Sequence, residues 1–260
     1  MSAIEFKFVA IVAIFITGLL GGTLALRLDR TRRPEVFFSL GSALAAGIFL
    51  GAGLIHMLPD AVDGFSQMLP RLDYPLAALL AGSGFVLILT LERVVLAKAG
   101  QEGAVEAAVS QTQVFPYALT VILSLHSILT GIALGAEGTV LGSVIIFVAI
   151  IAHKGSAAFA LAVSLHRGGL ERSAIFKIIA GFSLTTPLGI GIGIGFDAIL
   201  SGTAGRGFEA VFDSLAAGTF IYIATLDIVQ EEFTRPRRLW PKLGLLCAGL
   251  GLMALIALWM

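Results

Sequence analysis

Two histidines in long apolar runs are the residues of this sequence best suited to bind a metal ion. His126 lies about eleven residues into one run and His153 about thirteen into the next, so both fall near mid-membrane at about 1.5 Å per helical residue. Neutral imidazole is a common ligand of zinc and related metals. A single buried histidine is usually a satisfied core residue, but two at one depth on sequential antiparallel helices favour a shared metal ion.

Polar side chains beside the two histidines add to this candidate site. Ser127 follows His126, and Thr130 lies one helical turn beyond His126 on the same face. Lys154 follows His153 at membrane depth, where ionisable groups are rare and are functional candidates by default. These residues would surround a bound ion with hydroxyl groups and one positive charge.

Four further polar residues are candidates for a pathway through the bilayer, namely His56, Asp60, Thr186 and Asp227. Pro187 removes a backbone donor in mid-run, so the Thr186 hydroxyl either satisfies the carbonyl left unpaired or faces a pathway. His56 and Asp60 end the second apolar run and Asp227 ends the seventh, at opposite membrane faces, where they would guide a cation in and out. The alternative for these interfacial charges is that they are solvated helix ends.

The composition indicates an integral membrane protein. The 260 residues are 57% hydrophobic and 13% charged, with a mean hydropathy of +0.97, whereas soluble domains carry about a quarter charged residues. Basic and acidic residues number 17 each, so no excess of positive charge indicates nucleic acid as a partner. The lipid bilayer is the expected surrounding.

Apolar runs long enough to cross a bilayer core define about eight spans. They cover residues 8–26, 36–58, 75–96, 115–136, 140–165, 175–200, 211–229 and 241–260. The connections between them, among them PDAVDGFSQMLPRLDYP, are short. We therefore expect a single all-α transmembrane domain over residues 1–260, built as an eight-helix bundle.

Lys and Arg gather on one side of these spans. That side holds Arg27, Arg30, Arg32, Arg33, Arg93, Lys98, Arg167, Arg172, Lys177, Arg235, Arg237, Arg238 and Lys242. The other side holds only Lys7, Arg71 and Arg206. The positive-inside rule therefore predicts that both termini are extracytoplasmic.

The sequence lacks the motifs of several alternative activities. It contains no GxxxxGK[ST] phosphate loop, so ATP-driven transport by this chain alone is not expected. Neither HExxH nor GxSxG occurs, and a metal hydrolase would need a third protein ligand, for which His56 lies too shallow. We expect neither an enzyme nor a prosthetic group.

Four segments resemble the signatures of the ZIP family of zinc and iron permeases. They are HSILTGIALG, HKGSAAFALAVSL, TTPLGIGIG and FIYIATLDIVQEEF, and the HKG is typical of the branch common in animals and plants. The resemblance covers nearly the whole chain and implies secondary or facilitative transport of a divalent transition metal, zinc first, toward the cytoplasm. It also implies a plasma membrane or bacterial inner membrane protein, and it admits a homodimer.

By this resemblance His126 and His153 are the transport-site ligands, with Ser127 beside them. Family members usually have an acidic residue one turn after the first histidine, where this chain has Thr130. The site would therefore offset the charge of a bound ion less than the sites of most members do.

Many members also have carboxylates where this chain has Lys154, Ala157 and Thr186, so a two-metal centre is not expected. The ammonium of Lys154 would take, electrostatically, the place of a second cation. What remains is a single site of two imidazoles, hydroxyls and water. The alternative is a ZIP-fold protein that has lost transport and serves as a regulator or scaffold.

Overall fold

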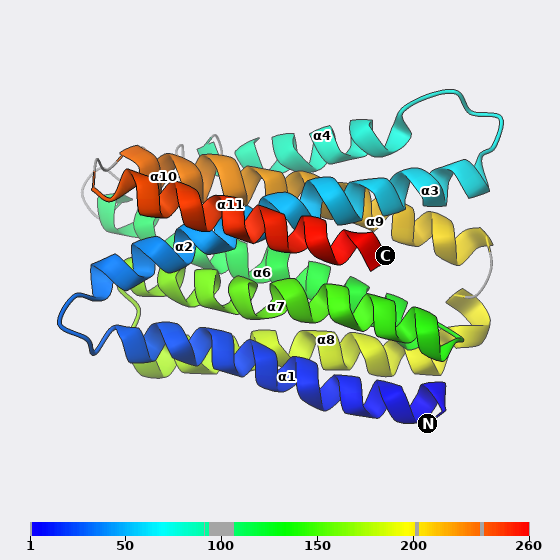
Figure 1. Cartoon of the computed structure of the whole chain (residues 1–260), viewed down its shortest axis with the longest axis horizontal. Coiled ribbons are helices and arrows are strands. Elements are labelled where there is room, and N and C mark those ends of the chain that lie inside the picture. Colours follow the sequence, from blue (N-terminus) through cyan, green and yellow to red (C-terminus); the bar gives the residue numbers. More distant parts are fainter. Residues whose placement is uncertain (1, 91, 94–106, 201–202, 235–236, 260) are drawn as a thin grey trace.

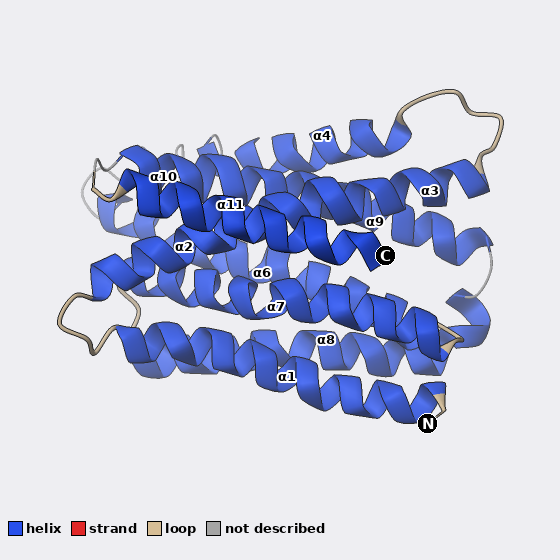
Figure 2. Cartoon of the chain, in the orientation of Figure 1, coloured by secondary structure: helices blue, strands red, loops and turns tan. Residues whose placement is uncertain are grey.

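The computed structural model describes residues 2–90, 92–93, 107–200, 203–234 and 237–259, and all regular elements within these ranges are helices (Figure 2). In chain order they are α1 (Ala3–Leu28), α2 (Pro34–Gly51), η1 (Ala52–Met57), α3 (Leu58–Met68), α4 (Leu76–Thr90), α6 (Ala107–Ala136), α7 (Val140–Arg167), α8 (Arg172–Leu200), α9 (Thr203–Tyr222), η3 (Ile223–Val229), α10 (Gln230–Thr234), α11 (Leu239–Ile256) and η4 (Ala257–Trp259). The η1 and η3 segments are π-helical, and η4 is a single 3₁₀ turn. The expected all-α class is confirmed.

The expected spans coincide with these helices. Among the described residues, 7 helices are long and apolar enough to cross a membrane. The α4 helix, with 15 described residues, is apolar but shorter, and the expected end of its span at residue 96 lies outside the described residues. Pro187 lies inside α8, which continues beyond it to Leu200.

Several helices extend beyond the expected spans: α6 begins at Ala107 and α9 at Thr203, and the second helix departs the most. The second span was expected to end at residue 58 and to lead into a connection, but the helix continues through η1 and α3 to Met68. Pro59, the second residue of α3, comes just after the π-helical η1, so it lies within the continuous helix. Ala61 and Phe65 are buried and form a small core with residues of α4 and α9, so one apolar stripe sustains the helix after the continuous apolar run has ended.

The helices form two groups that lie side by side (Figure 1). The α1 group consists of α1, α6, α7 and α8; the α2 group consists of α2–η1–α3, α4, α9–η3–α10 and α11. The groups meet chiefly where α2 packs on α7. The N-terminus and the turns at 69–75 and 137–139 lie at one end of the bundle, called the terminal face; the turns at 29–33, 168–171 and 237–238 lie at the other, called the basic face (Figure 1).

Glycine permits a close helix contact within the α1 group, between α6 and α8. A Cβ added at Gly131 would collide with the Thr186 carbonyl, and one added at Gly189 would collide with the Ile128 carbonyl. Small residues allow membrane helices to approach until their backbones touch. This approach brings the polar residues of α6 and α8 within reach of one another.

We expect Gly189→Ala to lower the free energy of unfolding by about 1–3 kcal/mol, because the added methyl overpacks the α6–α8 contact. Gly191→Ala, two residues away, is the matched control, since a Cβ there would meet no heavy atom within 4 Å. Denaturation of the purified variants in mild detergent, followed by circular dichroism, measures the difference. Equal stability of the two variants would contradict the close contact.

Candidate metal site

The two histidines predicted as ligands lie next to each other between α6 and α7. His126 is 6% exposed and His153 is 4% exposed. Their ring centroids are 5.7 Å apart, with the ring planes inclined at 48°. The expected adjacency of the two spans and of the two rings is therefore present.

Phe220 of α9 covers this pair of imidazoles from the α2 group. Its ring centroid lies 4.7 Å from that of His126 and 6.0 Å from that of His153. Nε2 of His126 and Nδ1 of His153 have no hydrogen-bond partner among the described atoms. A buried nitrogen without a partner is costly, so these two atoms are suited to receive a ligand.

Lys154 organises the polar residues on the other side of the pair. Its side chain is buried, and Nζ donates to Ser127 Oγ at 3.1 Å, to Thr186 Oγ1 at 3.0 Å and to the Phe182 carbonyl at 3.1 Å. Nζ also lies 3.8 Å from the centroid of the Phe182 ring, where a cation is attracted to the π face. No carboxylate among the described residues is within ion-pair distance of this ammonium.

Ser127 and Thr186 are thus brought together by Lys154, because both hydroxyl groups accept a hydrogen bond from its Nζ. Thr186 is fully buried and lines neither of the cavities described below. Among the described residues, no group of three or more His, Cys, Asp and Glu side chains is arranged to hold a metal ion. The arrangement offers two imidazoles to one ion, beside the buried amino group of Lys154.

A cavity of about 380 Å³ opens beside His153 and extends toward the terminal face. Its polar lining consists of His56, Asp60, Thr130, Glu137, His153, Glu209 and Asp213. Thr130 therefore faces the space next to the histidines, while its hydroxyl lies 3.2 Å from the His126 carbonyl of its own helix. A carboxylate at position 130 would point into the same space.

The predicted pathway residues His56 and Asp60 meet in this cavity. Nδ1 of His56, in the π-helical η1, lies 2.8 Å from Oδ2 of Asp60, four residues further along the helix. Glu209 and Asp213 face the same cavity from α9 and were not predicted. Their spacing of four residues, which places them on one helix face, was the signal that could have found them.

A second cavity, of about 290 Å³, lies toward the basic face. It is lined by Asp227 of η3 together with Glu92, Glu231 and Arg167. The two cavities share no lining residue, and only the terminal-face cavity reaches His153. Buried Ala157 and Phe220 lie between them in α7 and α9.

Comparisons with known proteins agree with this membrane-embedded architecture. The family model of the ZIP zinc transporters matches residues 4–109 and 97–257. The chain is 30% identical to mouse zinc transporter ZIP2, over 85% of each chain, and 28% identical to zinc transporter ZIP1 of Takifugu rubripes, over 98% of each. It is 25% identical to zinc transporter 3 of Arabidopsis thaliana, over 98% of this chain and 85% of the relative.

The helices and the apolar surface define a polytopic integral membrane protein. Within that class, the chain belongs to the ZIP zinc transporter family.

We expect Thr130→Glu to tighten zinc binding about tenfold, or by about 1.4 kcal/mol, because a carboxylate there offsets the ion's charge where a hydroxyl does not. Thr130→Gln is the matched control, since it has nearly the same size and no charge. Calorimetry on the purified variants measures both affinities. If Glu and Gln act alike, or neither acts, position 130 does not contribute charge to the site.

Proposed function

We propose that this chain transports a divalent transition metal, zinc first, through a single site between His126 and His153. The observation that carries the proposal is the pair of buried imidazoles, 5.7 Å apart between ring centroids, with nitrogens that lack partners. The terminal-face cavity gives an ion access to this pair. Family membership supports metal as the cargo, and the names of the relatives support zinc.

The charges around the pair favour one ion over two. The ammonium of Lys154 already lies among Ser127, Thr186 and the Phe182 carbonyl, so a second dication there would meet a like charge. Within the part of the chain that the structure describes, no carboxylate bridges the histidines to that position. This environment supports one ion, which would be bound by the two imidazoles, by water and by the side chain of Thr130.

The proposed orientation in the membrane follows from the placement of basic residues, and the direction toward the cytoplasm is the one that the family resemblance implies. We take the basic face as cytoplasmic and both termini as extracytoplasmic, with residues 1–260 forming one transmembrane domain. Asp60 and His56 then lie on the outer side of the histidines, and Asp227 lies on the inner side. Movement of the α1 group, which carries both histidines, against the α2 group would expose the site to each side in turn.

A second candidate is a ZIP-fold protein that regulates or scaffolds without transporting. The observation in its favour is that the described residues next to the histidines include the neutral Thr130 and the amino group of Lys154, which leave the ion's double charge poorly compensated. Weak binding is compatible with transport, however, since a carrier must also release its cargo.

Vesicles containing the purified chain should take up zinc saturably, and His126→Ala should abolish both uptake and binding. His166→Ala is the matched control, because His166 lies at the basic-face end of α7 and pairs with Asp29. Absence of saturable uptake by the wild type, together with a gain of uptake in Thr130→Glu, would favour the regulator.

Asp60→Ala should raise the apparent KM for zinc more than it lowers the maximal rate. Asp60 is half exposed and contacts His56 in the terminal-face cavity, so it acts in capture and not at the central pair. Asp63→Ala, on the same helix and outside the cavity lining, is the control. An unchanged KM in Asp60→Ala would make Asp60 a solvated helix end.

A further inference from the structure

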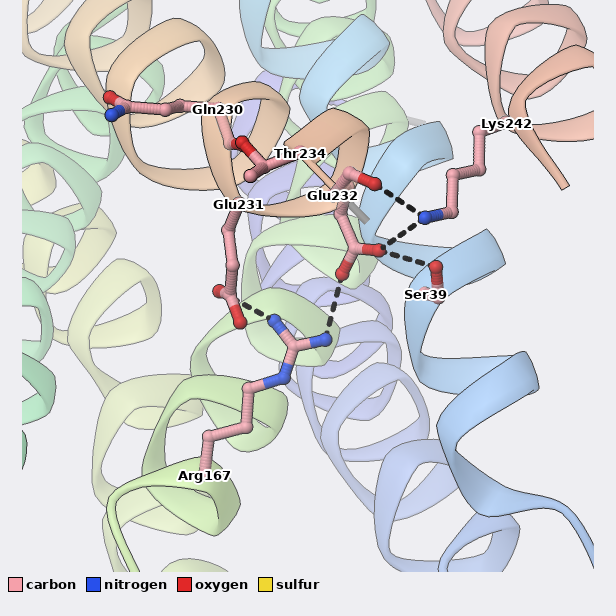
Figure 3. Close-up of polar contacts among 7 residues, drawn as sticks. All are labelled: Ser39, Arg167, Gln230, Glu231, Glu232, Thr234 and Lys242. Carbon is pink, nitrogen blue, oxygen red and sulfur yellow. Dashed lines mark hydrogen bonds and ion pairs between the residues drawn. The ribbon is translucent and has the colours of Figure 1, made fainter. Parts of the chain in front are cut away.

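Arg167, the last residue of α7, binds two consecutive carboxylates of α10 at the basic face. Nη1 lies 2.8 Å from Oε2 of Glu231, and Nη2 lies 2.7 Å from Oε1 of Glu232 (Figure 3). A guanidinium presents its N–H groups as a rigid fork, so one arginine holds both carboxylates in a fixed geometry. Because α7 belongs to the α1 group and α10 to the α2 group, this contact joins the two groups.

Glu232 is fixed within the α2 group by further partners. It is 1% exposed, its carboxylate accepts a hydrogen bond from Ser39 of α2, and Lys242 of α11 lies 3.3 Å from it (Figure 3). Lys242, itself 3% exposed, also donates to the Glu232 backbone carbonyl. Loss of Arg167 would therefore leave the buried carboxylate with a positive partner, which limits the cost to folding.

Neighbouring basic residues at this face pair within one group. His166 of α7 lies 3.3 Å from Asp29, which follows α1, and Arg172 of α8 lies 3.7 Å from the same carboxylate and donates to the Leu26 carbonyl. Among the described residues, the ion pairs that connect the α1 group to the α2 group are those of Arg167. Arg167 thus joins the two groups, whereas Arg172 pairs within the α1 group.

We propose that Arg167 is a lock between the two helix groups, which holds them with the terminal-face cavity open and the basic-face cavity shut off from the histidines. The two cavities agree with such a lock, since the terminal-face cavity reaches His153 and the basic-face cavity does not. Arg167 and Glu231 themselves line the basic-face cavity, beside Asp227. The role of the lock in transport rests on the proposed function, but its effect on cavity access does not.

Release of the lock changes the charge of the basic-face cavity. When α7 moves relative to α10, both contacts of the guanidinium break together, because one rigid fork makes them. Arg167 then no longer offsets the charge of Glu231, which lines the cavity together with Asp227, and this favours a cation arriving there. The same movement therefore opens the basic-face cavity and increases its attraction for the ion.

Thiol accessibility in the absence of metal tests the lock directly. In a Cys247→Ser background, Ser164→Cys reports on the basic-face cavity and Ala133→Cys on the terminal-face cavity. Both are labelled with a charged methanethiosulfonate on protein in lipid nanodiscs, where both faces are open to the reagent. Arg167→Gln should label Ser164→Cys about tenfold faster and Ala133→Cys more slowly, since removal of a group-joining ion pair shifts the populations of the two arrangements.

The controls separate a lock from a merely structural contact. Arg172→Gln breaks pairing within the α1 group and should leave the ratio of the two labelling rates unchanged; Arg167→Lys, which keeps the charge but not the fork, should fall between wild type and Arg167→Gln. Unchanged rates in Arg167→Gln, or a parallel rise at both thiols, would overturn the lock. Neither result depends on zinc, so a lock that fails here leaves the vesicle uptake test standing, and the converse also holds.

Discussion

The cost of placing charge in a low-dielectric interior governs where this chain holds its ionisable side chains. The buried centre holds two imidazoles, which bind metals in their neutral form, and an ammonium whose donors all find oxygen partners. Carboxylates such as Asp60 and Asp227 lie in the cavities toward either face. The buried Glu232 is held among a guanidinium, an ammonium and a hydroxyl.

Close helix packing makes the buried ammonium tolerable. Gly131 and Gly189 let the α6 and α8 backbones touch, which places Ser127 of α6 and Thr186 of α8 within hydrogen-bond distance of one Lys154 nitrogen. A bulkier residue at either glycine would widen the gap that this nitrogen spans. The small residues that the resemblance to TTPLGIGIG singled out therefore support the site as well as the fold.

The sequence predicted the features that depend on single helices. Apolar run length located the spans, and equal depth brought His126 and His153 together. It missed what depends on two helices from different parts of the chain, since neither the pairing of Arg167 with Glu232, 65 residues apart, nor the partners of Lys154 can be read from spacing. It also ended the second span too early, because hydropathy does not register a one-sided apolar stripe such as that of α3.

When the binding site of a carrier holds no carboxylate, a different step of the transport cycle limits the rate. In the proposed mechanism the ion's charge is compensated mainly in the two cavities, by acidic residues that concentrate it, and only weakly at the histidines, where a fixed ammonium opposes it. Release from the histidines is then easy, and the slow step becomes the relative movement of the helix groups. In the proposed mechanism the two charge-assisted bonds from Arg167 oppose that movement, which would place control of the rate at the basic face, away from the metal.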